Sequence, residues 1–468
     1  MKRVFNLLVL SALVLGLFAV PTLAAGNSRA YIVMASGNGF SAGLQAGLVG
    51  AGASINRVLP ELGMAFVTSN VADFSARAAR LSGVRSVVPD VVVQWIDPNL
   101  QVVEVDFANP PSSGDDDTLF DLQWGHDAVD AVEAWNAGYF GAGVRVAVLD
   151  SGIDAEHPDI APNLNAALSA SFVPGEHWNV RPGVFFSHGT HVAGTIAAAD
   201  NGIGVIGVAP QAEIVAVKVL SEYTGSGSFS GVIEGIYYAA MIDADIINMS
   251  LGALLPRHGW IDDNGTPEDP SDDFRVIGAE VAELSVATGR AVTWATQMGT
   301  TVIVAEGNDY LDKDHTGDWI TLPADLPHAL SIAATAPVGW ALDPGNVFLD
   351  NHASYSNYGK SAVDFAAPGG DFVYPGNENC TVAGRTRPCW VFDLVMSSGS
   401  QAWYWAAGTS MAAPHVSGVA AIIIGMNGGD MSPAHVEAAL RRSADDLGKP
   451  GNDEFYGGGR VNAGNTVP

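Results

Sequence analysis

The stretch VAVLDSG at residues 146–152 decides the fold class. Four consecutive apolar residues lead directly into the carboxylate of Asp150 and a Ser-Gly turn. A strand that is apolar on both faces is typical of a parallel sheet covered by helices on both sides. Because ligands bind at the carboxyl ends of such strands, Asp150 lies where a functional residue is expected.

Similar apolar runs follow along the chain and are separated by helical stretches. The run around Asp150 begins at Val144, and the others lie at residues 214–220, 246–249, 301–305 and 330–334. Continuous apolar strands that alternate with helices predict an α/β fold, in which a parallel sheet forms the middle of three layers.

The composition excludes several classes of protein. Among 468 residues, 21 Lys and Arg face 50 Asp and Glu, which gives a net charge of −29. With 48% hydrophobic residues the chain is not a disordered acidic tail. The shortage of basic residues argues against nucleic acid and anionic membrane surfaces as partners. The excess of carboxylates suits divalent cations, solubility or salty surroundings, and composition alone does not choose among these.

The amino terminus resembles a secretory signal. Lys2 and Arg3 precede an apolar run at residues 7–20, and small residues end the segment at Ala25. The run is shorter than the ~20 residues that span a bilayer, so an uncleaved membrane anchor is the weaker alternative. We expect no other segment to span a membrane. The sequence therefore predicts a secreted, extracellular protein with no membrane attachment after signal cleavage.

Export bears on the two cysteines of the chain, Cys380 and Cys389. In an oxidising compartment they can close a short loop as a disulfide. Two free, buried thiols are the alternative.

The rest of the chain divides into a small domain and a large one. Residues 29–95 alternate strand-like and helix-like runs in a β-α-β-β-α-β order, with a helix expected over 71–81, which fits a small α+β domain. A stretch rich in turn formers and acidic residues follows. The predicted boundaries are 1–25 for the signal, 26–108 for the small domain, 109–119 for a linker and 120–468 for the large domain.

Two further segments place a histidine and a serine at the start of helices. They are SHGTHVAGTIA at residues 187–197 and GTSMAAPHVSG at residues 408–418. A serine hydroxyl becomes a nucleophile when a histidine takes its proton and a carboxylate orients that histidine. Asp150, His188 and Ser410 are therefore candidates for a catalytic triad. Pro414 is expected in the first turn of its helix, where its missing N–H costs little.

Each of these residues also has a simpler interpretation. Asp150 can cap a turn, and Ser410 can cap a helix. His188 and His191 can bind a metal, although the glutamate of an HExxH zinc site is missing. The segment after Ser410 lacks the second glycine of G-x-S-x-G, which disfavours an esterase elbow.

Taken together, the segments resemble the subtilisin-like serine proteases. The resemblance covers residues 120–463 and includes VAEGN at 304–308, GVIGVAP at 204–210 and YGGGRVNA at 456–463. Residues 29–95 are similar to the propeptide of that family, with VVPD at 87–90 as its ending. In the family this domain assists folding and then inhibits the enzyme.

The resemblance implies a role for each candidate residue. Asp150 would orient His188, which would act as general base and then general acid, and Ser410 would be the nucleophile. Asn308 would stabilise the oxyanion together with the backbone N–H of Ser410. Residues 321–324 would lie near the floor of the main pocket. Two edge segments would bind an extended peptide between them: Gly225, Ser226, Gly227, Ser250, Leu251 and Gly252.

The resemblance also implies a structural calcium ion. Asp117 and Asp121 compete for the role of one further ligand that precedes the first strand of the large domain. The acidic insertion at residues 262–273 either holds another ion or is a solvated loop. The implied ligands are the side chains of Asp159 and Asn201 and the carbonyls of Ala199, Ile203 and Val205.

Glu306 departs from the family pattern, which has a small neutral residue at this place. It either points into a polar network away from the cleft or puts a negative charge near the oxyanion or the pocket. In the second case it would favour basic substrate residues.

The leading functional hypothesis is a secreted serine endopeptidase that acts on proteins and peptides as a monomer. Its own propeptide would inhibit it until maturation cuts the chain between Asp97 and Asp121. A trimming exopeptidase with a walled cleft is one alternative, suggested by the insertion at residues 262–273. A non-catalytic binding protein of the same fold is the other, although a substituted triad would then be expected.

Overall fold

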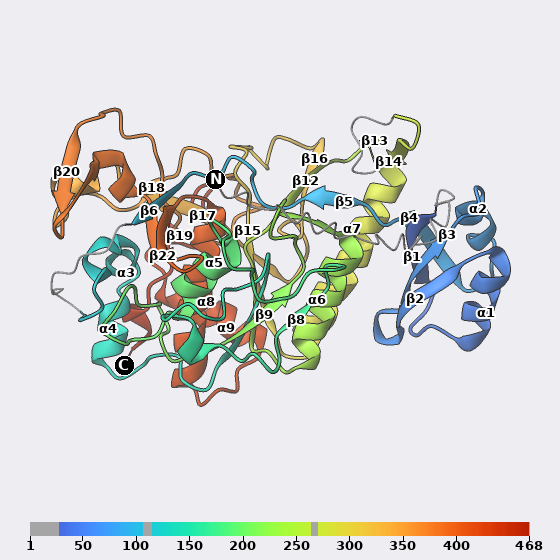
Figure 1. Ribbon diagram of the computed structural model, residues 1–468, viewed down its shortest axis with the longest axis horizontal. Coiled ribbons are helices and arrows are strands. Elements are labelled where there is room, and N and C mark those ends of the chain that lie inside the picture. The colour runs from blue at the N-terminus through green and yellow to red at the C-terminus, as the bar shows by residue number, and fades with distance from the viewer. Residues whose placement is uncertain (1–27, 106–114, 264–269, 468) are drawn as a thin grey trace, which may run out of the picture.

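The computed structural model describes residues 28–105, 115–263 and 270–467. The predicted signal, much of the predicted linker and part of the acidic insertion lie outside the described residues. Two units can be distinguished, a leader unit (residues 29–89) and a body (residues 115–467). In Figure 1 the leader unit lies at one end of the molecule, and the chain leaves it to cross the larger body.

The leader unit is a four-stranded antiparallel sheet in the order β2-β3-β1-β4 with two helices. Its elements follow the expected order. The second helix is shorter than the expected span of residues 71–81, because after Ala78 the chain continues in turns, with the N–H groups of Arg80 and Leu81 donating to the carbonyls of Arg77 and Ala78. The elements are β1 (Arg29–Ala35), α1 (Ala42–Ala51), β2 (Ser54–Leu59), β3 (Met64–Ser69), α2 (Phe74–Ala78) and β4 (Val84–Pro89).

A mostly parallel sheet forms the centre of the body. Its order is β18-β17-β15-β11-β7-β9-β8, and β19 also pairs with β17. The strands predicted from apolar runs are found and pair in parallel, so the predicted fold class is confirmed. The strands are β7 (Arg145–Asp150), β8 (Ala170–Ser171), β9 (Glu213–Lys218), β11 (Ile246–Met249), β15 (Thr301–Ala305), β17 (Ala329–Ala336), β18 (Asn351–His352) and β19 (Phe365–Pro368).

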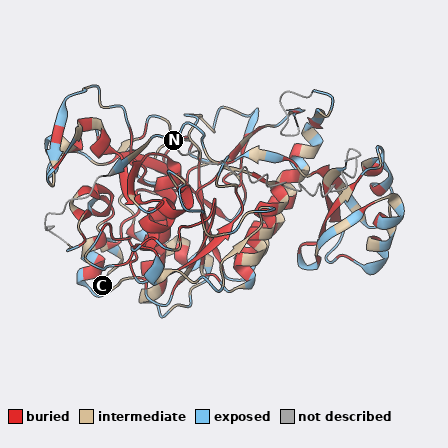
Figure 2. Cartoon of the chain, viewed as in Figure 1, coloured by how far each residue is buried: buried red, intermediate tan, exposed pale blue. Residues whose placement is uncertain are grey.

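Helices cover both faces of this sheet and complete three layers. Helices α5 (His188–Ala197) and α8 (Thr409–Met426) pack on one face, and α6 (Phe229–Met241) and α7 (Gly278–Gln297) on the other. Along β7, Val146 and Val148 join the first layer, whereas Ala147 and Leu149 join the second. Figure 2 shows this centre as a continuous buried region.

Helix α8 corrects one expectation. It is long and apolar enough to cross a membrane, although we expected no such segment after the signal. Because 89% of the helix is buried inside the body, its apolar character is explained by packing on the sheet.

Smaller elements surround the sheet. Cys380 of β20 and Cys389, which directly follows β21, are joined in a disulfide, the first of the two expected alternatives. The remaining elements are β5 (Val92–Gln94), β6 (Val102–Val105), α3 (Trp124–Ala128), α4 (Ala131–Asn136), β10 (Ser226–Ser228), β12 (Ala253–Pro256), β13 (Gly259–Asp262), β14 (Phe274–Ile277), β16 (Trp319–Leu322), β20 (Asn379–Val382), β21 (Arg385–Pro388), β22 (Val395–Ser398), β23 (Trp403–Ala406) and α9 (Pro433–Ser443).

Candidate active site

Asp150 and His188 form a buried pair at the carboxyl edge of the sheet. Asp150 is the last residue of β7 and His188 the first of α5. The Nδ1 atom of His188 lies 2.9 Å from each carboxylate oxygen of Asp150. The backbone N–H of Ser151 donates to the same carboxylate over 2.6 Å. Asp150 therefore fixes the orientation of the imidazole ring.

Local sequence explains why the helix can begin so close to the strand. A side chain at Gly189 would overlap the carbonyl oxygen of Gly152, so only glycine permits this approach. The hydroxyl of Ser187 caps the helix by accepting from the N–H of Thr190 over 3.3 Å. The small residues around His188 thus set its distance from Asp150.

Ser410 lies at the start of α8 and is linked twice to the strand-end residue Ser250. Its hydroxyl donates to the carbonyl of Ser250 over 3.1 Å, and the hydroxyl of Ser250 donates to the carbonyl of Ser410 over 2.7 Å. Pro414 lies inside the helix, not in its first turn as expected, because the helix begins at Thr409. Since proline has no N–H, the carbonyl of Ser410 is left available to Ser250.

One segment of the chain, around Asp97 and Pro98, lies beside both His188 and Ser410. His188 Nε2 is buried and has no hydrogen-bond partner among the described residues. Asp97 and Pro98 line a pocket with His188 and a second pocket with Ser410. Helices α5 and α8, which begin at His188 and Thr409, also pack against each other.

Asn308 lies beside Ser410 in the second of these pockets. Its side-chain oxygen accepts from the backbone N–H of Thr409 over 2.9 Å and from the hydroxyl of Thr409 over 2.8 Å. This arrangement leaves the amide nitrogen as the end of the side chain that can donate to a substrate oxygen.

The two expected peptide-binding edges both form hydrogen bonds with residues 92–105, which follow the leader unit and are called the leader chain below. Strand β5 pairs with β10 in antiparallel fashion, with Gln94 opposite Ser226. Beyond β5, the N–H of Trp95 donates to Gly225 over 3.2 Å, and the carbonyl of Trp95 accepts from Gly252 over 3.1 Å. The structure thus brings the segments at residues 225–227 and 250–252 together around one leader residue.

The chain then turns in the cleft and continues on the other side. The N–H of Leu100 donates to the carbonyl of Asp97 over 3.2 Å, and the N–H of Asn99 donates to the Asp97 side chain over 2.8 Å. After this turn, β6 pairs with β23. Strand β6 was not predicted, although the run of Val102, Val103 and Val105 is a strand signal.

A pocket of about 410 Å³ lies under the turn. Besides Ser410 and Asn308 it is lined by Leu254, Asp309 and Thr321, so Thr321 is found at the expected pocket. A larger cavity of about 720 Å³ lies between the leader unit and α7, and none of the candidate catalytic residues lines it.

Glu306 lies away from the cleft, as in the first of its two expected placements. It is fully buried, and the hydroxyl of Ser331 donates to its Oε2. Burial, with a contribution from the nearby Asp325, raises the pKa of Glu306 to about 8, and Lys313 opposes the rise. At neutral pH the side chain is therefore mainly uncharged.

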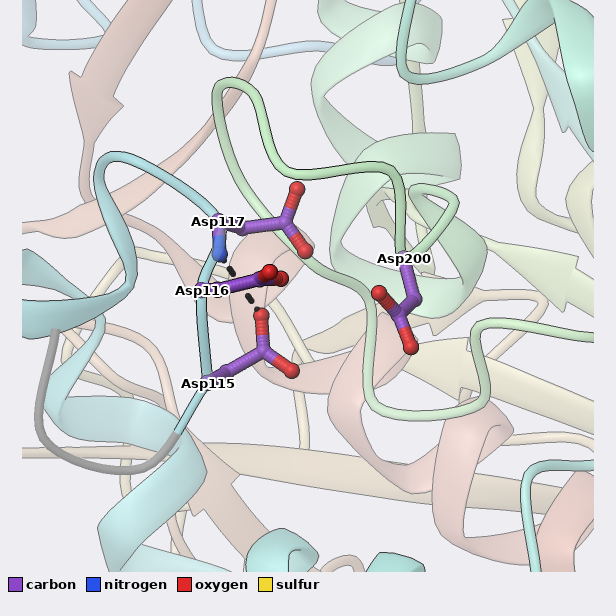
Figure 3. Close-up of side chains that lie close together, drawn as sticks. All are labelled: Asp115, Asp116, Asp117 and Asp200. Carbon is purple, nitrogen blue, oxygen red and sulfur yellow. Dashed lines mark hydrogen bonds between the residues drawn. The ribbon is translucent and has the colours of Figure 1, made fainter. Parts of the chain in front are cut away.

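Acidic groups gather at the predicted calcium loop, as Figure 3 shows. Of the two competing residues, Asp117 is seen to bond this loop, and its Oδ1 accepts from the N–H of Ile203 over 3.0 Å. Asp117 Oδ2 is buried without a hydrogen-bond partner among the described residues. Asp200 joins the group although it was not among the predicted ligands. Burial, with a contribution from Asp115, raises the pKa of Asp117 to about 8.

Asp159 lies next to this loop. Its Oδ2 accepts from the N–H of Val205 over 3.0 Å and from the indole N–H of Trp403 over 2.6 Å. The contact with Trp403 was not predicted, because nothing in the local sequence connects the two residues. The side chain of Asn201 lies 3.5 Å from Asp159 Oδ1. The oxygen atoms of this loop, with one buried carboxylate oxygen free, fit a hard cation.

Known proteins share both sequence and fold with this chain. The model of the subtilase family, Peptidase_S8, matches residues 141–459. M-protease of Shouchella clausii is 36% identical over 344 residues, which cover 73% of this chain and 69% of that protein. Subtilisin Savinase of Lederbergia lenta has the same identity over 73% of this chain and 97% of its own length.

Solved structures agree with this fold. The epidermin leader peptide processing serine protease of Staphylococcus aureus has a TM-score of 0.71 at 20% identity, over 94% of this chain and 97% of that one. A structure described as a lanthipeptide protease has a TM-score of 0.56 at 25% identity, over 74% of this chain and 93% of that one.

Proposed function

This chain belongs to the subtilase family of serine peptidases, and from that premise we propose that it is a secreted serine endopeptidase made as a zymogen. The observation that carries the proposal is the course of the leader chain. It lies along the peptide-binding edges, turns between His188 and Ser410, and continues beyond them on β23.

The geometry supports an acyl-enzyme mechanism. His188 takes the proton of the Ser410 hydroxyl, whose oxygen bonds to the carbonyl carbon of the substrate. The negative charge that develops on the carbonyl oxygen is stabilised by Asn308 and the backbone N–H of Ser410. His188 then gives its proton to the leaving amine as the peptide bond breaks. Water, activated by the same histidine, hydrolyses the ester and restores Ser410.

The leader unit would act as an inhibitor until it is cut. Residues 92–96 occupy the strand positions that a substrate would take, so they exclude other peptides from the cleft. The turn from Asp97 to Leu100 lies nearest the catalytic side chains, and we place the first cut there or shortly after it. This lies within the predicted range from Asp97 to Asp121.

A calcium ion would add stability without taking part in the chemistry. Asp117, Asp159 and Asn201, with the carbonyls of residues 199, 203 and 205, would hold it and would tie the calcium loop to the start of the body. The ion would supply charge compensation for the carboxylates that gather there.

The course of the leader chain also distinguishes the alternatives. A trimming exopeptidase needs a wall at one end of its cleft, whereas here chain lies on both sides of the catalytic residues. A non-catalytic protein would be expected to lack a triad residue, but all three positions are filled. We therefore favour an endopeptidase that works as a secreted monomer.

Hydrolysis of casein, followed by mass spectrometry of the fragments, tests the proposal. We expect internal cuts with the full-length wild type after maturation, and a loss of at least about 10⁴-fold for Ser410→Ala, which lacks the attacking oxygen. Ser285→Ala on α7 is the matched control and should keep full activity. Fragments shortened only from one end would support the exopeptidase, and no cleavage would support the binding protein.

A further inference from the structure

Among the described residues, one edge of strand β23 pairs with β6 and with no other strand. It pairs with β22 on one side and with β6 on the other, in a three-stranded sheet. Four residue pairs join β23 to β6, from Ala406 opposite Val102 to Trp403 opposite Val105. Because β6 lies outside the body, its removal would leave the backbone groups of β23 unpaired. Such an edge readily accepts another strand.

The direction of β6 is the direction that a substrate would take. Strand β23 leads toward the nucleophile, since Ala406 precedes Ser410 by four residues. Strand β6 is antiparallel to it and begins directly after the turn at Asp97 to Leu100. It therefore runs away from the catalytic residues, as the part of a polypeptide on the carboxyl side of the cut bond would.

The contacts of β6 indicate which side chains fit. Val102 and Val103 are half-buried and pack against the main core of the body, whereas Glu104 is exposed. Tyr404 lies opposite Glu104 and contacts the exposed ring of Phe185 at a centroid distance of 5.5 Å. Apolar surface thus lines this side of the cleft, and β-branched side chains suit both the pairing and the packing.

We propose that β23 is a substrate-binding strand, which pairs with the residues of a polypeptide substrate on the carboxyl side of the cut bond. It selects segments that stay extended over about four residues beyond the bond and favours Val or Ile among them. In the uncut chain β6 occupies this strand. The inference rests on the proposed peptidase function and adds to it a requirement for long, extended substrates.

A set of peptides of increasing length tests the pairing. The peptides share one sequence before the cut bond and carry one to six residues after it. With enzyme matured from the full chain, we expect kcat/KM to rise by about tenfold or more between two and five such residues and then to level off, because each further pair adds hydrogen bonds. N-terminal sequencing shows whether β6 remains attached. If it does, Val103→Pro frees the strand, since proline lacks the N–H and fits poorly inside a sheet.

Backbone methylation gives a second, independent measurement. In an antiparallel pair, successive N–H groups point alternately toward the partner strand and away from it. Placing one N-methyl group at each of the second to fifth residues after the cut should therefore lower kcat/KM at alternate positions only, by about fivefold to tenfold. The neighbouring positions serve as matched controls with the same added methyl group.

The outcomes separate this inference from the function on which it rests. A length-dependent rise with an alternating methylation pattern supports strand pairing on β23. Equal cleavage of all lengths beyond two residues, or uniform effects of methylation, overturns the pairing but leaves the peptidase function in place. Failure to cleave any peptide, long or short, overturns both.

Discussion

The leader unit and the body bury their sheets in different ways. The central sheet of the body has its own helices on both faces. In the leader unit, Tyr31 and Val33 of β1 face the leader's own helices, whereas Ile32 and Met34 join the core that contains α6 and α7 of the body. The body can therefore keep its core without the leader, but the leader leaves an apolar face uncovered without the body. This asymmetry suits a domain that is removed once folding is complete.

Polar contacts also connect the leader side of the molecule to helices α6 and α7 of the body. Asp90, next to β4, accepts from the N–H and the hydroxyl of Ser230 in the first turn of α6, over 3.0 and 2.5 Å. Arg290 of α7 donates to the leader carbonyls of Ala35 and Leu62. These polar contacts lie at the margin of the apolar core that the leader unit shares with the body.

The largest expected effect comes from removing a large apolar side chain from the core that the leader unit shares with the body. Phe66 of β3 lies in the core common to leader and body, so Phe66→Ala should destabilise the docked leader by about 3–5 kcal/mol. Thermal unfolding of the uncut Ser410→Ala chain measures this. Val49→Ala, at an exposed position of α1, is the control and should change stability by less than about 0.5 kcal/mol. Equal destabilisation by both changes would contradict the shared core.

A smaller change in stability is expected when calcium is removed from the body. An ion that binds only the folded body adds about 2.7 kcal/mol at a hundredfold excess over Kd. Chelation should therefore shorten the half-life of activity at elevated temperature, and Asn201→Ala should remove most of the difference. Asn379→Ala, on the exposed β20, should keep it. Identical half-lives of the wild type with calcium and with chelator would exclude the site.

Buried histidines should make the body sensitive to acid. Burial lowers the pKa of His126 and of His191 to about 3 and that of His415 to about 4, so all three are neutral in the folded state. The unfolded chain binds a proton at each near pH 6.5. Stability is therefore complete above that pH and is lost as pH falls toward 4, by up to about 1.4 kcal/mol per pH unit and histidine.

His126→Leu sharpens this prediction. Neither ring nitrogen of His126 has a hydrogen-bond partner among the described residues, and Phe120 and Trp135 surround the ring. The variant should lose less stability than the wild type between pH 7 and pH 5, as followed by thermal melting. An unchanged slope would show that His126 does not contribute.

The smallest effect is expected for Glu306→Gln. With a pKa of about 8 in the fold, against an ordinary value of 4.5, Glu306 contributes stability that declines as pH rises from 4.5 through 8. The variant should therefore gain in relative stability at pH 9, while its preference between Lys and Leu substrates stays within about tenfold. A larger change in preference would place this side chain in the pocket after all.

The local sequence predicted the elements that are surrounded by apolar side chains on all sides. The parallel strands were placed within about two residues of their observed bounds, since a strand that is buried on both faces has a continuous apolar run. The proximity of Asp150 and His188 likewise follows from strand-end and helix-start positions with glycines at the contact. Asp117 could not be chosen over Asp121, because both are acidic and lie within one turn of each other.

Pairings between distant segments could not be read in this way. Strands β5 and β6 are short, and their partners β10 and β23 lie far along the chain. The same holds for the bond from Trp403 to Asp159. Pro414 was expected in the first turn of its helix but lies further inside. The helix begins at Thr409, whose backbone N–H donates to Asn308, and this distant contact could not be predicted from the local sequence.

The intact mass of the purified chain tests the central claim most directly, namely that Ser410 cuts the leader segment lying across its own cleft. Wild type and Ser410→Ala are produced side by side from the full sequence, and each is measured by mass spectrometry and N-terminal sequencing. We predict that the wild type begins between residues 98 and 121, and that Ser410→Ala retains the leader unit joined to the body. A Ser410→Ala chain that is cut at the same bond when incubated alone would contradict the account.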